Sequence, residues 1–251
     1  MKKLLSFMIC FCFVLASAFT FVACGNEKVS IDDTMDRIEE TSAPAGSFMT
    51  LLSSQQWNEQ QEPIVEATSS YMRMLSGINT FLTMLDLFND GEYSNDLHDM
   101  GVITKDGNTY TFTDGEDITK VVVKSGKDTL TLTVDETSTL KYTLAKNYLR
   151  IDASETSEGE TFQAWAELKV NKNNHYYQLV MKEDETYNVI NFKYNFTLTE
   201  VGDAEYATIN SFSTIAKTGE TTEPSSIKGL KDYETYATGE GAVTYTSPTV
   251  Q

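Results

Sequence analysis

Apolar and polar residues alternate with a period of two from about residue 101 to residue 213, and this pattern constrains the fold more than any other feature. Successive side chains of a β-strand point to opposite faces, so the period predicts strands with one apolar face. It is clearest at residues 129–134, 140–144, 162–170, 177–181 and 190–198. Most of the core is therefore expected to come from a β-sheet.

The connections between these segments are short and polar, as at residues 125–127, 145–147 and 171–174. Parallel neighbours would need a crossover of about a dozen residues or more, and no such segment separates the predicted strands. We therefore expect an antiparallel meander of roughly eight to ten strands with one apolar face and one wet face. A meander of this length twists and curls, which predicts a half-barrel or barrel-like sheet.

An amphipathic helix is predicted ahead of the sheet, from residue 63 to residue 89. Pro63 suits a first helical turn, apolar residues then recur at spacings of three and four, and Asn89-Asp90-Gly91 supplies a C-terminal stop. Its broad apolar stripe needs a large partner surface, which the sheet offers. The expected fold class is α+β and mostly β, with a curved antiparallel β-meander packed against a long N-terminal amphipathic helix.

The N-terminus has the three parts of a secretory signal. Lys2 and Lys3 supply positive charge, an apolar run follows at residues 4–22, and the small residue Ala23 ends it. This pattern predicts export of the chain.

Residues 21–24 resemble the lipobox of bacterial lipoproteins: Val22, Ala23 and Cys24 match, whereas Phe21 stands where that family usually has Leu. The resemblance implies cleavage before Cys24, lipidation of its sulfur, and a domain anchored at the extracytoplasmic face of the cell membrane. Two acyl chains anchor a protein stably where one does not. The alternative is an uncleaved membrane-spanning anchor, because residues 4–22 are just long enough at ~20 residues per span.

The expected organisation follows from these features and from composition. Residues 1–23 form the signal peptide, and residues 24–46 form the lipidated Cys24 and a polar spacer, with a helical turn at residues 31–40. Residues 47–215 form the helix and antiparallel sheet. Residues 216–251 form a Thr-, Gly- and Glu-rich tail in which residues 242–246 could add one last strand.

Charge and cysteine content limit the classes of partner. The chain has a net charge of −18, which repels nucleic acid and anionic lipid head groups, so a lipid tether rather than a basic patch is expected to hold it at the membrane. Cys10 and Cys12 leave with the signal peptide, so Cys24 is the only cysteine of the mature chain and a disulfide is excluded.

No catalytic motif is complete. Residues 217–219 and 225–228 look like two signatures of penicillin-interacting serine enzymes, but their order is reversed and the third signature is missing. His98 and His175 are the only histidines and lack the spacing of a zinc site. We therefore expect a protein that is not an enzyme and needs no cofactor or metal.

The predicted layout is similar to that of half-barrel lipoprotein-carrier and lipid-carrying lipoproteins. This resemblance implies an apolar or lipid ligand between helix and sheet. The side chains expected to line such a cavity are Met74, Ile78, Phe81, Leu85, Phe192 and Tyr194. The alternative is a structural or interaction module with a filled core, and the presence of a cavity between helix and sheet distinguishes the two.

Two aromatic residues fall on the predicted wet face. Trp165 lies between Gln163 and Glu167, and Tyr176 occupies the same face of the next strand. Either they pack beneath a loop or the C-terminal tail, or they form a surface aromatic patch used in recognition.

Overall fold

The computed structural model describes residues 28–42, 44–87, 103–114, 116–157, 159–201, 204–231 and 233–247. The predicted signal peptide and the lipidation site at Cys24 lie outside these residues. The chain divides into two compact units. The first unit comprises residues 1–39, 75–145 and 150–163, and the second comprises residues 40–74, 146–149 and 164–251.

Three α-helices lie within the described residues: α2 (Ile31–Ser42), α3 (Ala45–Ser54) and α4 (Glu62–Leu87). The helix predicted for residues 63–89 corresponds to α4. The stretch predicted as a polar spacer, residues 24–46, contains α2. Ile31, Thr34 and Ile38 of α2 are buried, because side chains spaced by three and four residues lie on one face of a helix. This part of the stretch therefore belongs to a folded unit.

The described strands form an antiparallel sheet in which sequence neighbours are also neighbours in the sheet. The strands are β1 (Ile103–Asp106), β2 (Thr109–Asp114), β3 (Asp117–Ser125), β4 (Thr129–Val134), β5 (Ser138–Ala145), β6 (Tyr148–Ser157), β7 (Glu160–Asn171), β8 (Asn174–Glu183), β9 (Thr186–Val201), β10 (Ala204–Glu220) and β11 (Val243–Thr246). Asn147, Lys172 and Asp184 have positive φ angles of 55°, 54° and 53°, which suit tight hairpin turns. The expected α+β class, mostly antiparallel β, is confirmed.

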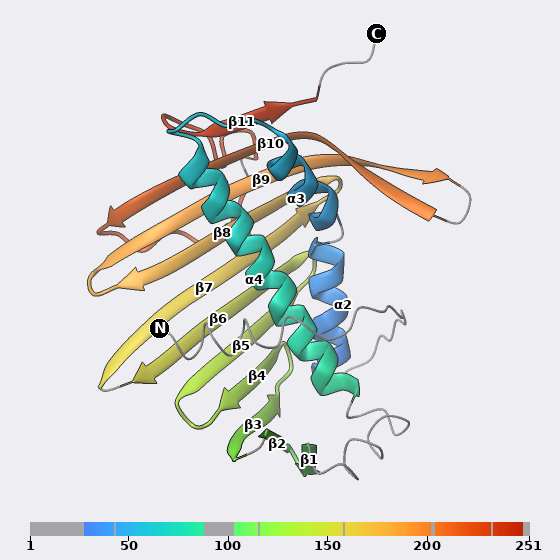
Figure 1. The fold of residues 1–251 in the computed structure, drawn as a ribbon, viewed down its shortest axis with the longest axis vertical. Coiled ribbons are helices and arrows are strands. Elements are labelled where there is room, and N and C mark those ends of the chain that lie inside the picture. Colours follow the sequence, from blue (N-terminus) through green and yellow to red (C-terminus); the bar gives the residue numbers. More distant parts are fainter. Residues whose placement is uncertain are drawn as a thin grey trace. The chain divides into compact units, whose positions relative to one another are not determined.

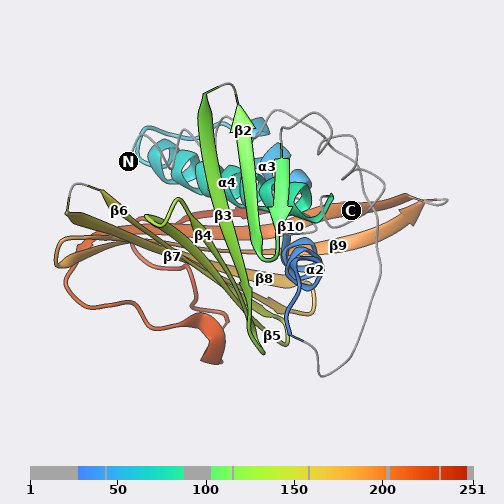
Figure 2. The same ribbon diagram turned by 90° about the horizontal axis from the view of Figure 1, so that it is seen from below.

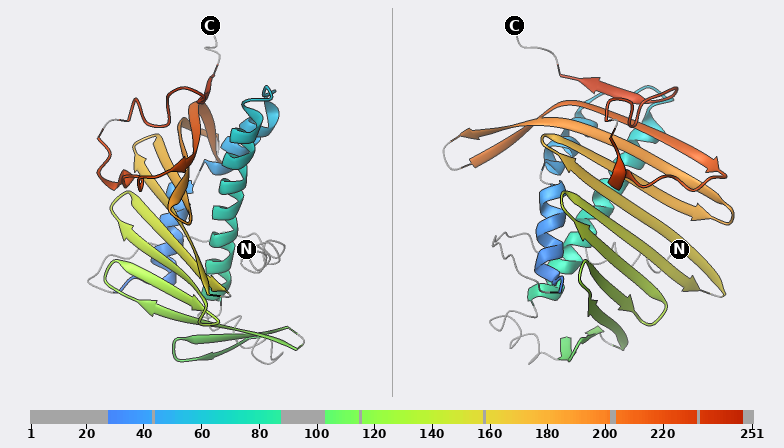
Figure 3. Two further views of the ribbon diagram at one scale, coloured as in Figure 1. Left: turned by 90° about the vertical axis from the view of Figure 1, so that its left-hand side faces the viewer. Right: turned by 180° about the vertical axis from the view of Figure 1, so that it is seen from behind.

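The second unit places helices on one face of its strands and chain from the C-terminal region on the other. Figure 1 shows β8, β9, β10 and β11 side by side, and Figures 2 and 3 show α3 and the C-terminal segment on opposite faces of these strands. We define the C-terminal segment as residues 221–242, which link β10 to β11 and include the short 3₁₀-helix η2 (Ile227–Gly229). Both faces of the strands are therefore covered.

The helix-facing core of the second unit is aromatic. The Phe48 ring of α3 stacks on that of Phe192 with centroids 5.8 Å apart, and it lies 4.7 Å from Tyr194 and 5.4 Å from Phe212. Tyr71 of α4 meets the Phe192 ring edge-on at 5.4 Å. All five side chains are at most 3% exposed. Aromatic pairs in these geometries stabilise a core beyond the area that they bury, so the rings hold α3 and α4 on the strands.

The first unit follows the predicted alternation closely. In β4, Leu130 and Leu132 are fully buried and the threonines between and beside them are half-buried. Tyr142 of β5 lies opposite Leu130 in the register and is also fully buried. Leu82 and Leu85 of α4 are fully buried in the same unit. The apolar positions read from the sequence therefore form this core.

The expectation of one wet sheet face is wrong for the second unit. Trp165, Tyr176 and Val180 point away from the helices but are 8%, 2% and 0% exposed. The reason is that Trp165 and Val180 pack with Val189 and Tyr187, and that the C-terminal segment covers Tyr176 with Tyr233. The last strand expected at residues 242–246 is present as β11, which pairs with β10 and places Tyr245 opposite Phe212.

Phe192→Asp is expected to unfold the second unit, because it puts an unpaired charge at a position that is 0% exposed. The cost, about 4 kcal/mol or more, is a large part of a typical total of ~5 to 15 kcal/mol. Leu198→Asp is the matched control: Leu198 alternates in phase with Phe192 on β9 but is 45% exposed, and a surface change costs about 0.5 kcal/mol or less. Urea unfolding measures both, and equal losses would contradict this core.

Candidate functional site

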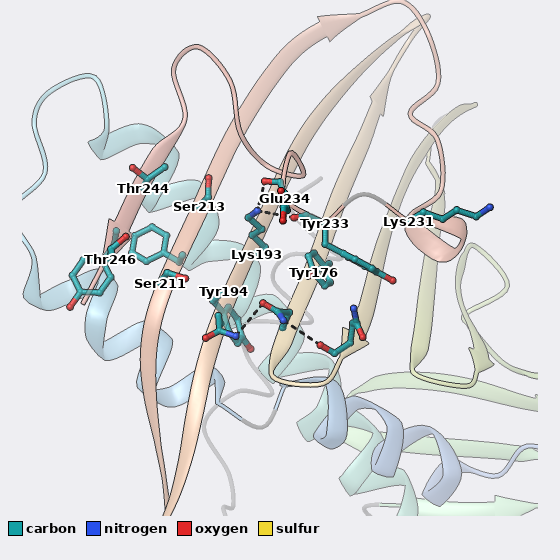
Figure 4. A pocket seen from close by; sticks show the side chains of 15 residues that line it. Tyr176, Lys193, Tyr194, Ser211, Ser213, Lys231, Tyr233, Glu234, Thr244 and Thr246 are labelled. Atoms are coloured by element: carbon teal, nitrogen blue, oxygen red, sulfur yellow. Dashed lines mark hydrogen bonds between the residues drawn. The ribbon is translucent and has the colours of Figure 1, made fainter. Parts of the chain in front are cut away.

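A groove with a volume of about 640 Å³ lies in the second unit, beside the C-terminal segment. Figure 4 shows Ser211, Ser213, Thr244 and Thr246 along one side, with Lys193, Tyr176 and Tyr233 across from them. The described residues that line it are Asn171, Asn174, Tyr176, Lys193, Tyr194, Asn195, Ser211, Phe212, Ser213, Lys231, Tyr233, Glu234, Thr244, Tyr245 and Thr246. Its size falls within the ~300 to 1,000 Å³ typical of small-ligand sites.

One fully buried carboxylate attaches the start of the C-terminal segment to the sheet. The Oε1 atom of Glu167 accepts a hydrogen bond from the Tyr148 hydroxyl at 2.8 Å, and Oε2 accepts one from the Ile227 backbone N–H at 2.6 Å. Both Glu167 and Ile227 are at most 2% exposed. Burying a carboxylate is costly unless its oxygens are hydrogen-bonded. Glu167 therefore needs the Ile227 N–H as a donor, and this hydrogen bond holds the segment in place.

Two lysines of the same sheet face hold the segment through its backbone. Lys169 Nζ donates to the carbonyl oxygens of Lys228 and Leu230, at 2.7 and 3.2 Å. Lys193 Nζ donates to the carbonyl oxygens of Tyr233 and Glu234, at 2.8 and 2.7 Å. Hydrogen bonds from a charged donor are stronger than those between neutral groups, so both lysines fix the course of the chain.

Aromatic contacts continue this attachment next to the groove. The Tyr176 ring lies 4.6 Å from that of Tyr233 and 5.7 Å from that of Tyr236. Burial, with Tyr233 alongside, raises the pKa of Tyr176 to about 12. The Tyr236 hydroxyl donates to the Tyr177 carbonyl oxygen at 2.7 Å, and burial raises the pKa of Tyr236. Both phenols therefore stay protonated in neutral solution, and that of Tyr236 acts as a hydrogen-bond donor.

A row of amide side chains orders the end of the groove. Asn195 Nδ2 donates to Asn174 Oδ1 at 3.2 Å and to the Asn173 carbonyl oxygen at 3.1 Å. Asn210 Nδ2 donates to Asn195 Oδ1 at 2.8 Å. Since each amide is both donor and acceptor, the row fixes the orientation of its members.

Comparisons with family models, with curated proteins and with solved structures found no significant match to this chain. What the groove can bind is therefore inferred from the residues that line it. No helix within the described ranges is long and apolar enough to cross a membrane. The described part of the chain also holds no group of three or more His, Cys, Asp and Glu side chains arranged to hold a metal ion.

The residues predicted to line an apolar cavity are divided between the two units. Met74, Phe192 and Tyr194 lie in the second unit, and the remaining three, Ile78, Phe81 and Leu85, lie in the first. The last three are at most 8% exposed, and Met74 is half-buried. Phe192 and Tyr194 take part in the aromatic core, where the Tyr194 hydroxyl lies 2.6 Å from that of Tyr177. Of the six residues, Tyr194 alone is also among the groove residues.

Trp165 and Tyr176, considered as a surface aromatic patch, are both buried. Trp165 packs with Val180 and Val189, and its ring meets that of Tyr187 edge-on at 6.0 Å. Tyr176 lies beneath Tyr233 of the C-terminal segment, as in the alternative of packing under the tail. Neither side chain forms an exposed patch, because neighbouring side chains and the segment cover them.

The two fragments that look like serine-enzyme signatures lie in different elements of the structure. Residues 217–219 are in β10, and residues 225–228 lead into η2. His98 lies outside the described residues, and His175 is 3% exposed, with its Nδ1 3.3 Å from the Tyr177 hydroxyl. His175 is thus part of a buried aromatic cluster.

The sequence did not reveal the groove residues on the outer face, such as Lys193, Asn195 and Tyr233. They come from strands and from a segment far apart in the chain, and most of them are ordinary polar residues. One signal was available: Trp165 and Tyr176 on a nominally wet face required a cover. The spacing of Tyr233 and Tyr236 in the tail offers rings to provide it.

Glu167→Gln is expected to loosen the C-terminal segment, since an amide offers one acceptor oxygen where the carboxylate accepts from both Tyr148 and Ile227. Leaving one buried donor unsatisfied costs about 2 kcal/mol. Limited proteolysis should show faster cleavage within residues 221–242, together with a lower melting temperature. Glu160→Gln, at an exposed position of the same strand, is the control. Identical cleavage of the two variants would show that Glu167 does not hold the segment.

Proposed function

We propose that this chain is a membrane-anchored, extracytoplasmic lipoprotein that is not an enzyme and acts by binding at its exposed surface. The observation that carries the proposal is the distribution of space in the second unit. Phe48, Tyr71 and Phe192 pack ring against ring on the side that faces the helices, whereas a groove of about 640 Å³ opens on the side of the C-terminal segment. This distribution favours an interaction module over a carrier.

The proposed anchor rests on Cys24 and its neighbours, which resemble a lipobox. The net charge of −18 supports a covalent tether, since an acidic surface is repelled by anionic head groups. The proposal includes the half-barrel layout expected from the sequence, with α4 on the apolar face of the sheet. The contact of Tyr71 in α4 with Phe192 in β9 supports that layout.

The composition of the groove supports a binding role without catalysis. Its described lining includes no His and no Cys, and Glu234 is its single carboxylate. General acid–base and nucleophilic catalysis usually need such groups in pairs within hydrogen-bond reach. Lys193 instead donates to backbone carbonyl oxygens, which is a structural role.

Cys24→Ser tests the anchor. The serine hydroxyl cannot accept the diacylglyceryl group as the thiol does, so we expect the variant to stay unprocessed or to appear without lipid. Metabolic labelling with a fatty acid and membrane fractionation in a bacterial host measure this, and Ser30→Ala, downstream of the lipobox, is the control. Membrane association of a processed, unlabelled variant would contradict tethering through Cys24.

Native mass spectrometry of the domain expressed from Gly25 onward, without signal peptide or lipid anchor, separates the surface module from a lipid carrier. A filled core predicts the mass of the polypeptide alone. A co-purified mass that matches a phospholipid or fatty acid would favour the apolar-ligand function, with Ile78, Phe81 and Leu85 as the first positions to substitute.

A further inference from the structure

We propose that the groove beside the C-terminal segment binds a neutral oligosaccharide. This inference rests on the proposed function, because it names the ligand of a protein that acts by surface binding. Its basis is the match between the groove's lining and a ligand that carries many hydroxyl groups but no charge. That match has three parts: hydrogen-bonding groups, ring surface and preorganisation.

The groove offers neutral groups that both donate and accept hydrogen bonds. Its polar lining consists mainly of amides and hydroxyls: Asn171, Asn174, Asn195, Ser211, Ser213, Thr244 and Thr246. Amides and hydroxyls both donate and accept, which is also what a sugar hydroxyl requires, although the Ser213 hydroxyl already donates to the Ala237 carbonyl oxygen. Figure 4 shows the serine and threonine side chains on one side of the groove. A chain of sugar units could therefore satisfy its hydroxyl groups along the groove.

The charge of the groove fits a neutral ligand. The whole chain carries 37 acidic and 19 basic residues, yet among the described residues that line the groove Lys193, Lys231 and Glu234 are the only charged ones. Lys193 directs its ammonium group at two backbone carbonyl oxygens, and Figure 4 shows Lys231 pointing away from the groove. Among these described residues a phosphate or carboxylate ligand would find no converging cations, and a cationic ligand would find a single carboxylate.

An aromatic ring supplies the apolar part of the lining. Tyr233 is half-buried and supported from beneath by Tyr176. The C–H faces of a sugar ring are weakly positive and suit the negative face of an aromatic ring. A ring held by such a neighbour offers contact area at a low entropic cost.

The polar end of the groove is ordered in advance. Asn195 holds Asn174 and is itself held by Asn210, so these amides keep one orientation without a ligand. The Ser213 hydroxyl donates to the Ala237 carbonyl oxygen, which ties the far side to the C-terminal segment. Groups fixed before binding lose little freedom on binding, and this lowers the cost of association for a weakly hydrophobic ligand.

Saturation-transfer difference NMR on the detergent-solubilised full chain tests the proposal. The probes are neutral tetrasaccharides of glucose, mannose, xylose and N-acetylglucosamine at millimolar concentration, compared with an oligogalacturonate and an extended peptide at the same concentration. We expect saturation transfer to at least one of them. Thr246→Arg and Thr244→Arg place a long side chain at exposed positions inside the groove and should weaken that binding at least tenfold. Thr222→Arg, at an exposed position that is not part of the groove, should leave it unchanged.

Three results would overturn the proposal. No transfer to any neutral probe would exclude this ligand class. Binding that survives both groove substitutions would place the saccharide elsewhere. Transfer confined to a charged saccharide or to an extended peptide would assign the groove to another class of ligand. Each of these results leaves the Cys24→Ser and lipid-content measurements unaffected, so failure of this inference is distinct from failure of the proposed function.

Discussion

The buried Glu167 carboxylate is the contact on which the outer layer of the second unit depends. A carboxylate without access to water must find donors in the protein, and Glu167 finds them in the Tyr148 hydroxyl and the Ile227 backbone N–H. Lys169 and Lys193 add hydrogen bonds to backbone carbonyl oxygens farther along the segment. Glu167, Lys169 and Lys193 are polar residues typical of a solvent-exposed face, but here they bind the segment that covers it.

The groove is a consequence of this cover. The C-terminal segment crosses the sheet face and leads into β11, which pairs with β10. The groove lies between Tyr233 of the segment and the β11 residues Thr244 and Thr246. Tyr233 packs on Tyr176, and its carbonyl oxygen accepts a hydrogen bond from Lys193. This side of the groove is therefore held in a fixed position. Cover and binding surface are therefore built from the same contacts.

Local periodicity explains what the sequence could predict. The strand at residues 129–134 and the helix from residue 63 follow from spacings that repeat over a few residues. The course of the cover could not be predicted, because residues 221–242 have no period and bind largely through backbone carbonyl oxygens, which every residue has. Trp165 and Tyr176 indicated only that the wet face could have a partner. The groove combines positions as distant as Asn174 and Thr246, which no local pattern relates.

Hydrogen–deuterium exchange of the C-terminal segment tests most directly whether it is an integral layer of the fold. The Ile227 N–H donates a hydrogen bond to Glu167, and the Leu230 N–H donates one to the Ile227 carbonyl oxygen. Peptides that span residues 226–237 should therefore exchange far more slowly than an unstructured chain. Their protection should approach that of β11. Exchange of residues 226–237 at the rate of a free peptide, with β8 and β9 still protected, would contradict the account.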